Sequence, residues 1–126
     1  MTSLIYRDLS YKITGLLFEV HNELGRYRNE KQYADKFEEI LKREKIKYLR
    51  EYWIPQSFAG ERKNRNRVDF IIEDRIIIDF KAKTIITKED YFQMQRYLIT
   101  LKKRLGIIVN FRRKYLKPKR IVNSKI

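Results

Sequence analysis

Two aspartates and a lysine stand in stretches of the sequence that are otherwise apolar, where a charged side chain is costly unless it has a partner. Asp69 lies in the run VDFII, and Asp79 and Lys81 lie in the run IIIDFKAK. In a β-strand, side chains two residues apart point to the same face, so Asp79 and Lys81 are expected to share a face. A three-residue turn at 73–75 would place Asp69 opposite Asp79 on the neighbouring strand.

Two adjacent carboxylates repel each other unless a cation lies between them, and hard divalent ions such as Mg²⁺ prefer oxygen ligands. A lysine beside such an ion can polarise a phosphate, stabilise developing negative charge or help to activate a water. The residues therefore indicate a metal-assisted site. On their own they also allow an internal ion-pair cluster or a solvated strand face.

Apolar periodicity predicts the elements that would hold these residues. Spacings of three and four indicate helices, whereas aromatic and β-branched segments between turns indicate strands. Asn29 is a candidate N-cap, and Thr87 with Asp90 can cap a later helix. In chain order, the expected elements are helices at 4–24 and 29–45, a meander of strands at 48–58, 67–72 and 76–82, a helix that Thr87 caps and Gly106 ends, a buried strand at 107–109 and an edge strand at 121–122.

Length and composition limit the protein classes. The chain has 126 residues, 43% of them hydrophobic, so we expect one domain spanning 1–126 with a core of its own. Cysteine is absent and histidine occurs once, which excludes disulfides and thiolate metal sites and argues against a zinc finger. No apolar run approaches the roughly 18 residues of a membrane span, and the N-terminus lacks the apolar region of a signal peptide. A soluble cytoplasmic protein is therefore expected.

The charge balance is strongly basic, with 30 Lys and Arg against 16 Asp and Glu and a net charge of +14. Such a charge attracts polyanions, and phosphate contacts bind nucleic acid without reading its sequence. An anionic membrane surface is the weaker alternative, because the basic residues are spread over loops instead of one amphipathic helix. The candidate nucleic-acid-binding residues are Arg62, Lys63, Arg65 and Arg67, then Lys102, Lys103 and Arg104, then Arg112, Arg113 and Lys114, with a further basic run at 117–120.

A known pattern matches these residues. Val68-Asp69, nine intervening residues and Asp79-Phe80-Lys81 resemble the PD-(D/E)XK motif of the restriction-endonuclease-like nuclease superfamily. Gln93 and Tyr97 resemble the Q-h-x-x-Y motif of RecB-type members. Over about residues 4–122 the chain is similar to the small GxxExxY family within that superfamily. This similarity is carried by residues 18–25, Glu30 with Tyr33, the two strand motifs, residues 93–98 and residues 106–111.

The resemblance implies an α/β protein with a restriction-endonuclease-like core, namely a helix, a three-strand meander, a helix and a strand, preceded by an extra N-terminal helix. It implies Mg²⁺ or Mn²⁺ bound by Asp69, Asp79, Glu30 and the backbone carbonyl of Phe80. It also implies that Lys81 is the catalytic lysine, that Asp69, Asp79 and Glu30 take part in catalysis, and that Gln93 and Tyr97 flank the site from a helix.

The sequence departs from the family pattern at two positions. Tyr27 stands where GxxExxY has its glycine, and Asp79 stands where many members have glutamate. The function expected from the whole pattern is a metal-dependent nuclease that hydrolyses phosphodiester bonds of nucleic acid, with DNA expected ahead of RNA. The alternative is a non-catalytic nucleic-acid-binding module on the same fold. The sequence leaves a homo-oligomer open.

Overall fold

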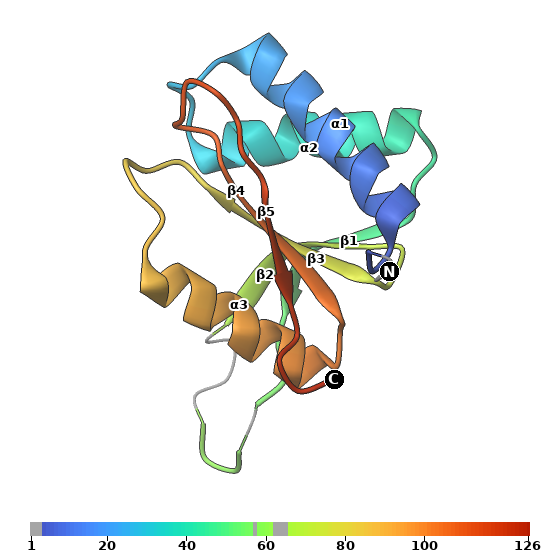
Figure 1. Cartoon of the computed structure of the whole chain (residues 1–126), viewed down its shortest axis with the longest axis vertical. Coiled ribbons are helices and arrows are strands. Elements are labelled where there is room, and N and C mark those ends of the chain that lie inside the picture. The colour runs from blue at the N-terminus through green and yellow to red at the C-terminus, as the bar shows by residue number, and fades with distance from the viewer. Residues whose placement is uncertain (1–3, 57, 62–65) are drawn as a thin grey trace.

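The computed structural model describes residues 4–56, 58–61 and 66–126, which form three helices and one five-stranded sheet (Figure 1). Every neighbouring pair of strands is antiparallel except β3 and β4, which run parallel and are joined through α3. The predicted order of elements, including the edge strand at the C-terminus, is confirmed. In chain order they are α1 (Arg7–Leu24), α2 (Glu30–Arg43), β1 (Tyr48–Trp53), β2 (Arg67–Ile72), β3 (Ile76–Lys81), α3 (Lys88–Leu101), β4 (Leu105–Asn110) and β5 (Lys119–Val122), and the sheet keeps the strands in this order.

Helix starts follow the local sequence signals. The Asn29 side chain accepts a hydrogen bond from the Gln32 N–H at 2.9 Å, and Gln32 Oε1 accepts one from the Asn29 N–H at 3.0 Å. Thr87 and Asp90 form the same reciprocal arrangement at the start of α3. Each of these two reciprocal arrangements, known as capping boxes, satisfies backbone N–H groups that the first helical turn leaves unpaired. Both α2 and α3 begin at the side of the sheet where β3 and β4 end (Figure 1).

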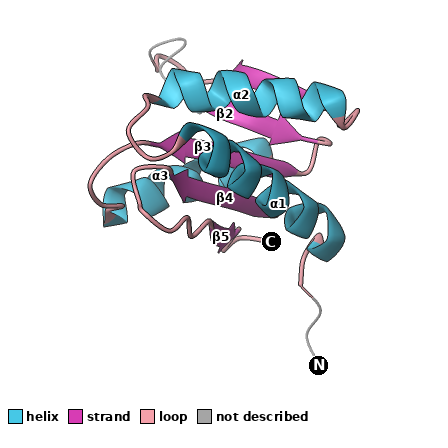
Figure 2. Cartoon of the chain, turned by 90° about the horizontal axis from the view of Figure 1, so that it is seen from above, coloured by secondary structure: helices cyan, strands magenta, loops and turns pink. Residues whose placement is uncertain are grey.

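Helices cover both faces of the sheet, with α1 and α2 on one face and α3 on the other (Figure 2). Beneath α1 and α2, the buried rings of Phe37, Phe70, Phe80 and Phe111 pack against one another with centroid distances of 5.0–5.5 Å. A smaller apolar cluster around Met94 packs α3 against the opposite face. Charged side chains on the central strands can therefore reach solvent only at the ends of the sheet (Figure 2).

Helix α3 ends earlier than the sequence predicted. Leu105 continues the apolar spacing of the helix, and Gly106 was expected to stop it, but the helix ends at Leu101 and both residues belong to β4. Lys102 closes the helix in a left-handed conformation (φ 55°), and the Lys103 N–H bonds to the Leu98 carbonyl at 2.9 Å. Gly106 serves packing instead, because a β-carbon there would clash with the Met94 side chain.

The first strand is also shorter than predicted, and it is irregular where it passes Asp69. It ends at Trp53 instead of continuing to residue 58, and Pro55 follows two residues later. Glu51 has a left-handed backbone (φ 55°), and the pairing of β1 with β2 is interrupted between Arg50 and Tyr52. Asp69 therefore lies beside an irregularity of the neighbouring strand. At this point the side chains of β2 also stop alternating regularly between the two faces of the sheet.

The change of face is visible in the residues that flank Asp69. Val68 packs in the cluster beneath α3, whereas Phe70 packs beneath α1 and α2, although regular alternation would put both on one face.

No helix among the described residues has the length and apolarity needed to cross a membrane.

Candidate active site

The end of β3 carries the central charged pair. Asp79 Oδ2 lies 3.0 Å from Lys81 Nζ, and the two side chains are only 8% and 18% exposed. Ile77, two residues before Asp79, packs beneath α3. The expectation that Asp79 and Lys81 share a strand face agrees with this geometry, and the face is the one covered by α3.

Asp69 joins this pair from β2. The turn at 73–75 pairs Ile72 with Ile76 as predicted, but regular pairing of β2 with β3 stops at Phe70 and Ile78, one position before the aspartates. Beyond that point Asp69 Oδ2 accepts a hydrogen bond from the Phe80 N–H at 2.6 Å. The Asp69 side chain thus bonds to the β3 backbone itself.

The two carboxylates act on each other electrostatically. Burial, and next the neighbouring Asp79 charge, raise the pKa of Asp69 to about 8, against the opposing effect of the Phe80 N–H. Asp79 Oδ2 is shielded from water and accepts no well-directed hydrogen bond from the described residues, although the charge of Lys81 lies close to it. A buried carboxylate pair with this little compensation is suited to receive a cation.

Lys81 lies beside two acceptors contributed by α3. Its Nζ donates to Gln93 Oε1 at 3.3 Å and lies 3.8 Å from Asp90 Oδ1. Burial alone would lower the pKa of Lys81, but the charges of Asp79, Asp90 and Glu30 outweigh it and raise that pKa. The lysine is therefore held in place as a cation.

Glu30 and Tyr97 approach the same charges from two helices. Glu30 is the first residue of α2, and although it is exposed overall, its carboxylate lies near the Ala82 backbone. Partial burial raises the pKa of Glu30, while Lys81 and, slightly, the Ala82 backbone oppose the shift. Tyr97 of α3 is 4% exposed, and burial together with the Asp79 charge raises its pKa to about 12. The structure thus places Gln93 in hydrogen-bond contact with Lys81, and Glu30 and Tyr97 within electrostatic range of the pair on β3.

A hollow of about 260 Å³ connects two of the acids. Glu30 from α2 and Asp69 from β2 both line it, together with Phe80. Arg50 and Arg67 also line it, and both are paired with acids: Arg50 with Asp35 and Glu38, and Arg67 with Glu51, which lines the hollow as well. Glu30 and Asp69 can therefore face one small group placed at the end of the sheet.

The carboxylates offer a divalent ion a small donor set. Among the described residues, no three His, Cys, Asp or Glu side chains form a group that could enclose a metal. The buried, under-bonded Asp79 oxygen beside Asp69 nevertheless fits a hard cation of the Mg²⁺ kind, which binds through one or two carboxylates and keeps several waters. The site therefore fits such an ion through two carboxylates, and not as an all-protein cage.

Three further residues, Asp90, Lys83 and Asn110, support the site and were not predicted as part of it. Asp90 pairs with Lys83 at 2.5 Å as well as approaching Lys81. The buried Asn110 side chain accepts from the Lys83 N–H (3.1 Å) and the Arg112 N–H (3.2 Å) and donates to the Lys83 carbonyl (2.7 Å). Asn110 lies beside Lys81 across the parallel strands. The capping motif pointed to Asp90, but only the strand register reveals the contacts of Asn110.

The basic runs occupy different parts of the molecule. Residues 112–114 follow β4 after Phe111, and the Arg112 N–H bonds to Asn110 beside Lys81, whereas residues 102–104 precede β4 at its other end. The six residues of β4, about 16 Å from first to last, separate these two runs. Lys103 is moreover paired with Asp74 at 2.8 Å. Arg67 begins β2 and lies over the Trp53 ring, while Arg62, Lys63 and Arg65 lie outside the described residues.

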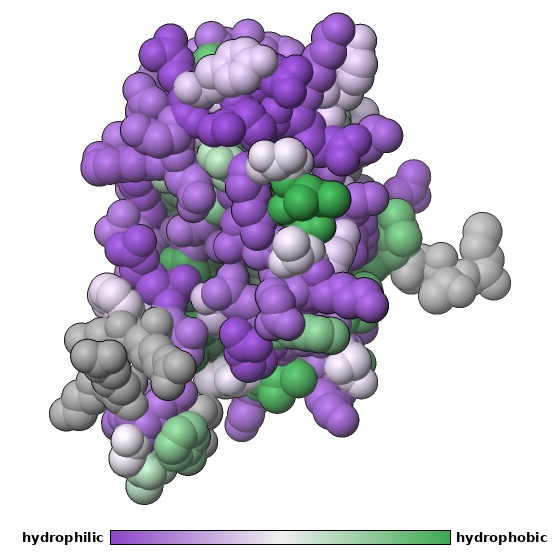
Figure 3. All heavy atoms as spheres, turned by 90° about the vertical axis from the view of Figure 1, so that its left-hand side faces the viewer, coloured by the Kyte–Doolittle hydropathy of each residue, from purple (hydrophilic) through white to green (hydrophobic). Residues whose placement is uncertain are grey.

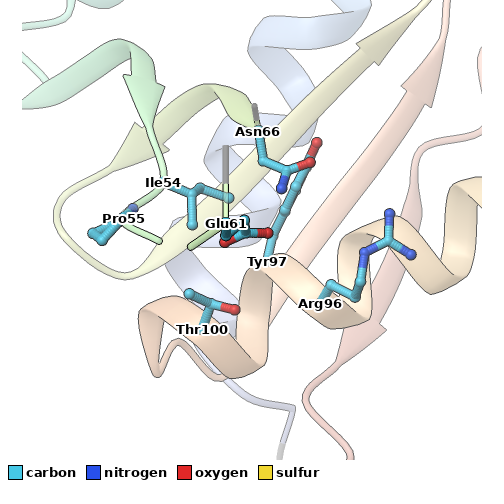
Figure 4. Close-up of a pocket in the computed structure, with 7 residues that line it drawn as sticks. All are labelled: Ile54, Pro55, Glu61, Asn66, Arg96, Tyr97 and Thr100. Atoms are coloured by element: carbon cyan, nitrogen blue, oxygen red, sulfur yellow. The ribbon is translucent and has the colours of Figure 1, made fainter. Parts of the chain in front are cut away.

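A second hollow, of about 370 Å³, lies behind Tyr97 (Figure 4). Arg96, Tyr97 and Thr100 line it from α3, while Ile54 and Asn66 line it from the ends of the neighbouring strands. Tyr97 thus borders both this hollow and the charged pair on β3.

Comparison with known proteins agrees with this geometry. A family model described as the PD-(D/E)XK nuclease superfamily matches residues 7–122, and no curated protein matches the chain. The match covers all eight elements and contains every charged residue of the site. The predicted superfamily and its restriction-endonuclease-like fold are therefore confirmed: the chain belongs to the PD-(D/E)XK nuclease superfamily.

Proposed function

We propose that the protein is a metal-dependent nuclease that hydrolyses phosphodiester bonds of nucleic acid, with DNA as the preferred substrate. One observation carries the proposal: Asp69 and Asp79 converge at the open end of the sheet with Lys81 held 3.0 Å from Asp79. The superfamily supports a nuclease-like protein, and the net charge of +14 supports a polyanionic substrate.

The residues would divide the work as follows. Asp69 and Asp79 would hold Mg²⁺ or Mn²⁺ directly. Glu30 and Phe80, whose carboxylate and carbonyl the resemblance adds to the ligand set, line the same hollow as Asp69. Such an ion supplies Lewis-acid stabilisation of phosphoryl oxygens and lowers the pKa of water.

Lys81 would place a positive charge where negative charge develops on the phosphate during attack. Its contacts with Gln93 and Asp90 restrict the ammonium to one position, which reduces the reorganisation needed at the moment of reaction. Tyr97, kept neutral by burial, would act as a hydrogen-bond donor beside the carboxylates.

The finer assignment to the GxxExxY family is also a proposal. Glu30 and Tyr33 support it, because the Tyr33 hydroxyl donates to the Gly25 carbonyl at 2.6 Å and accepts from the Arg28 N–H at 3.1 Å. Tyr33 thereby closes the turn that presents Glu30. Tyr27, in the place of the family glycine, has no positive φ, so the turn does not depend on glycine there.

We further propose that 1–126 is one domain, since one sheet carries both apolar clusters.

Cleavage of labelled single- and double-stranded DNA and RNA, with Mg²⁺, Mn²⁺ or EDTA, tests the proposal. The informative variant is Lys81→Ala, compared with Lys42→Ala, which removes the same charge from the exposed far end of α2. We expect Lys81→Ala to lose at least about 100-fold in cleavage rate, in line with loss of a preorganised electrostatic group. Because it removes one of 30 cations, it should keep nearly all of its nucleic-acid affinity.

Two results would reject the proposal. Wild-type protein that binds nucleic acid but cleaves none of these substrates with either ion would be a binding module. Lys81→Ala that cuts as fast as Lys42→Ala would show that hydrolysis occurs elsewhere.

A further inference from the structure

Two loops meet next to the candidate active site. Residues 25–29 connect α1 with α2, and residues 111–118 connect β4 with β5, and the two lie together in Figure 1. Arg26 Nε donates to the Arg112 carbonyl at 2.9 Å, and Arg112 Nε donates to the Arg26 carbonyl at 3.0 Å. Two guanidinium groups are thus held together by backbone carbonyls without a carboxylate between them.

The charge of this surface is uncompensated. The two loops contain six Lys and Arg and no Asp or Glu. None of the six forms an ion pair with any part of the chain that the structure describes, whereas Lys36, Arg43 and Arg50 on other surfaces each pair with at least two acids. Like charges at close range favour an anionic ligand. The side of the molecule that carries the two loops is largely hydrophilic (Figure 3).

The loops are anchored to the core. Tyr33 binds the first loop through its hydroxyl and stacks on Phe111 of the second, with ring centroids 4.2 Å apart and planes 9° apart. His21 Nε2 lies 2.9 Å from the Arg113 carbonyl, at hydrogen-bond distance. The basic side chains therefore project from a pre-organised base, which lowers the entropic cost of binding.

Each loop also exposes one aromatic ring next to a cation. Tyr27 is 78% exposed with the Arg26 guanidinium 5.2 Å from its ring centroid, and Tyr115 is 69% exposed with Lys114 Nζ at 5.5 Å. Exposed rings interleaved with cations are the combination that binds single strands, because unpaired bases stack on the rings while cations contact the phosphates. Bases in a duplex are stacked within the helix and cannot do so.

We propose that residues 25–28 and 112–117, the loop platform, bind single-stranded nucleic acid and present it to the carboxylates. This inference rests on the proposed nuclease function. The platform adjoins the site through two short connections: Arg28 lies two residues before Glu30, and Asn110 bonds both to the Arg112 N–H and to the backbone of Lys83, just beyond Lys81.

Equilibrium binding in EDTA tests the platform separately from cleavage. The probes are fluorescent oligo(dT), oligo(rU) and a DNA duplex of equal length, and the protein is the full chain. Tyr27→Ala and Tyr115→Ala are compared with Tyr11→Ala, whose ring is 83% exposed on α1, about 20 Å of helix away from Gly25. Because the two platform rings are exposed, these variants should fold normally, and circular dichroism checks this.

We expect Tyr27→Ala and Tyr115→Ala each to weaken single-strand binding by about 5- to 100-fold, and duplex binding by less than about twofold. Tyr11→Ala should match wild type. The variant Arg113→Gln/Lys114→Gln should flatten the log–log salt dependence of single-strand binding by about 0.7 for each phosphate that the variant no longer neutralises. The relative affinities for oligo(dT) and oligo(rU) show which nucleic acid is preferred.

Equal losses for single strands and duplex, or no loss in either tyrosine variant, would overturn the platform. Wild-type protein that does not bind the single strands would overturn it as well. A wild-type protein that binds single strands through these tyrosines but cleaves nothing would instead retain the platform and reject the nuclease.

Discussion

Replacing Asp69 by asparagine should make the metal-free protein more stable. In the wild type, burial and the Asp79 charge disfavour the ionised form of Asp69. Asparagine removes that charge, yet its carbonyl oxygen can still accept the Phe80 N–H, and its amide can donate to the Asp79 carboxylate. The Asp79–Lys81 pair is left in place.

The size of the expected increase in the free energy of unfolding follows from the charge that the substitution removes. Two unit charges about 4 Å apart at an effective dielectric constant of about 20 repel by about 4 kcal/mol. Lys81 offsets part of this repulsion, and solvent at the open end of the sheet screens more. We therefore expect Asp69→Asn to raise the free energy of unfolding by about 1–3 kcal/mol at pH 8 in EDTA.

The gain should depend on pH in a defined direction. A carboxyl whose pKa is raised on folding binds protons more tightly in the folded state, so wild-type stability falls as pH rises from its ordinary pKa, roughly 4, to about 8. The advantage of Asp69→Asn should be small near pH 4 and reach its maximum above pH 8. Urea unfolding followed by circular dichroism across this range measures it.

Divalent ions should reverse the order of the two proteins. Millimolar Mg²⁺ or Mn²⁺ should raise the midpoint of thermal unfolding of the wild type, because a ligand that binds only the folded state stabilises it, and should change Asp69→Asn much less. A variant that is less stable than wild type at pH 8 in EDTA, or an advantage that does not change with pH, would refute this account of the carboxylate pair.

Two packing predictions accompany this one. Asn110→Ala removes three hydrogen bonds from a buried position and should lower the free energy of unfolding by about 2–4 kcal/mol in urea titrations, and it should also slow cleavage, since the backbone after Lys81 loses its support. Equal cleavage rates at a temperature where both proteins are folded would contradict the second part. Gly106→Ala should destabilise by about 1–3 kcal/mol because its methyl group meets Met94, and Met94→Val in the same chain should recover part of the loss; no recovery would show that the strain lies elsewhere.

Much of the geometry of the candidate site could be predicted because it depends on local rules. Strand alternation places Asp79 and Lys81 together, the three-residue turn sets Ile72 opposite Ile76, and helical spacing aligns Gln93 with Tyr97. Each of these relations is fixed by backbone periodicity within a short segment.

The remaining features depend on contacts distant in sequence. Leu105 continues the helical pattern of α3, so the sequence alone cannot show that strand pairing beside Ile76 takes it into β4. The left-handed backbone of Glu51 and the change of face at Asp69 reflect packing on both sides of the sheet. The contacts of Asn110 join segments 27 residues apart.

The parallel pairing of β3 with β4 also sets the order in which the site can be assembled during folding. The β2–β3 hairpin closes over a short turn and can form early, whereas β4 can pair with β3 only after the chain has completed the crossover through α3. On the ribosome, a chain interrupted before residue 105 would already contain both carboxylates and the lysine, but neither Asn110 nor the second loop of the platform. The candidate site would thus be completed only after β4 and the segment that follows it have been synthesised.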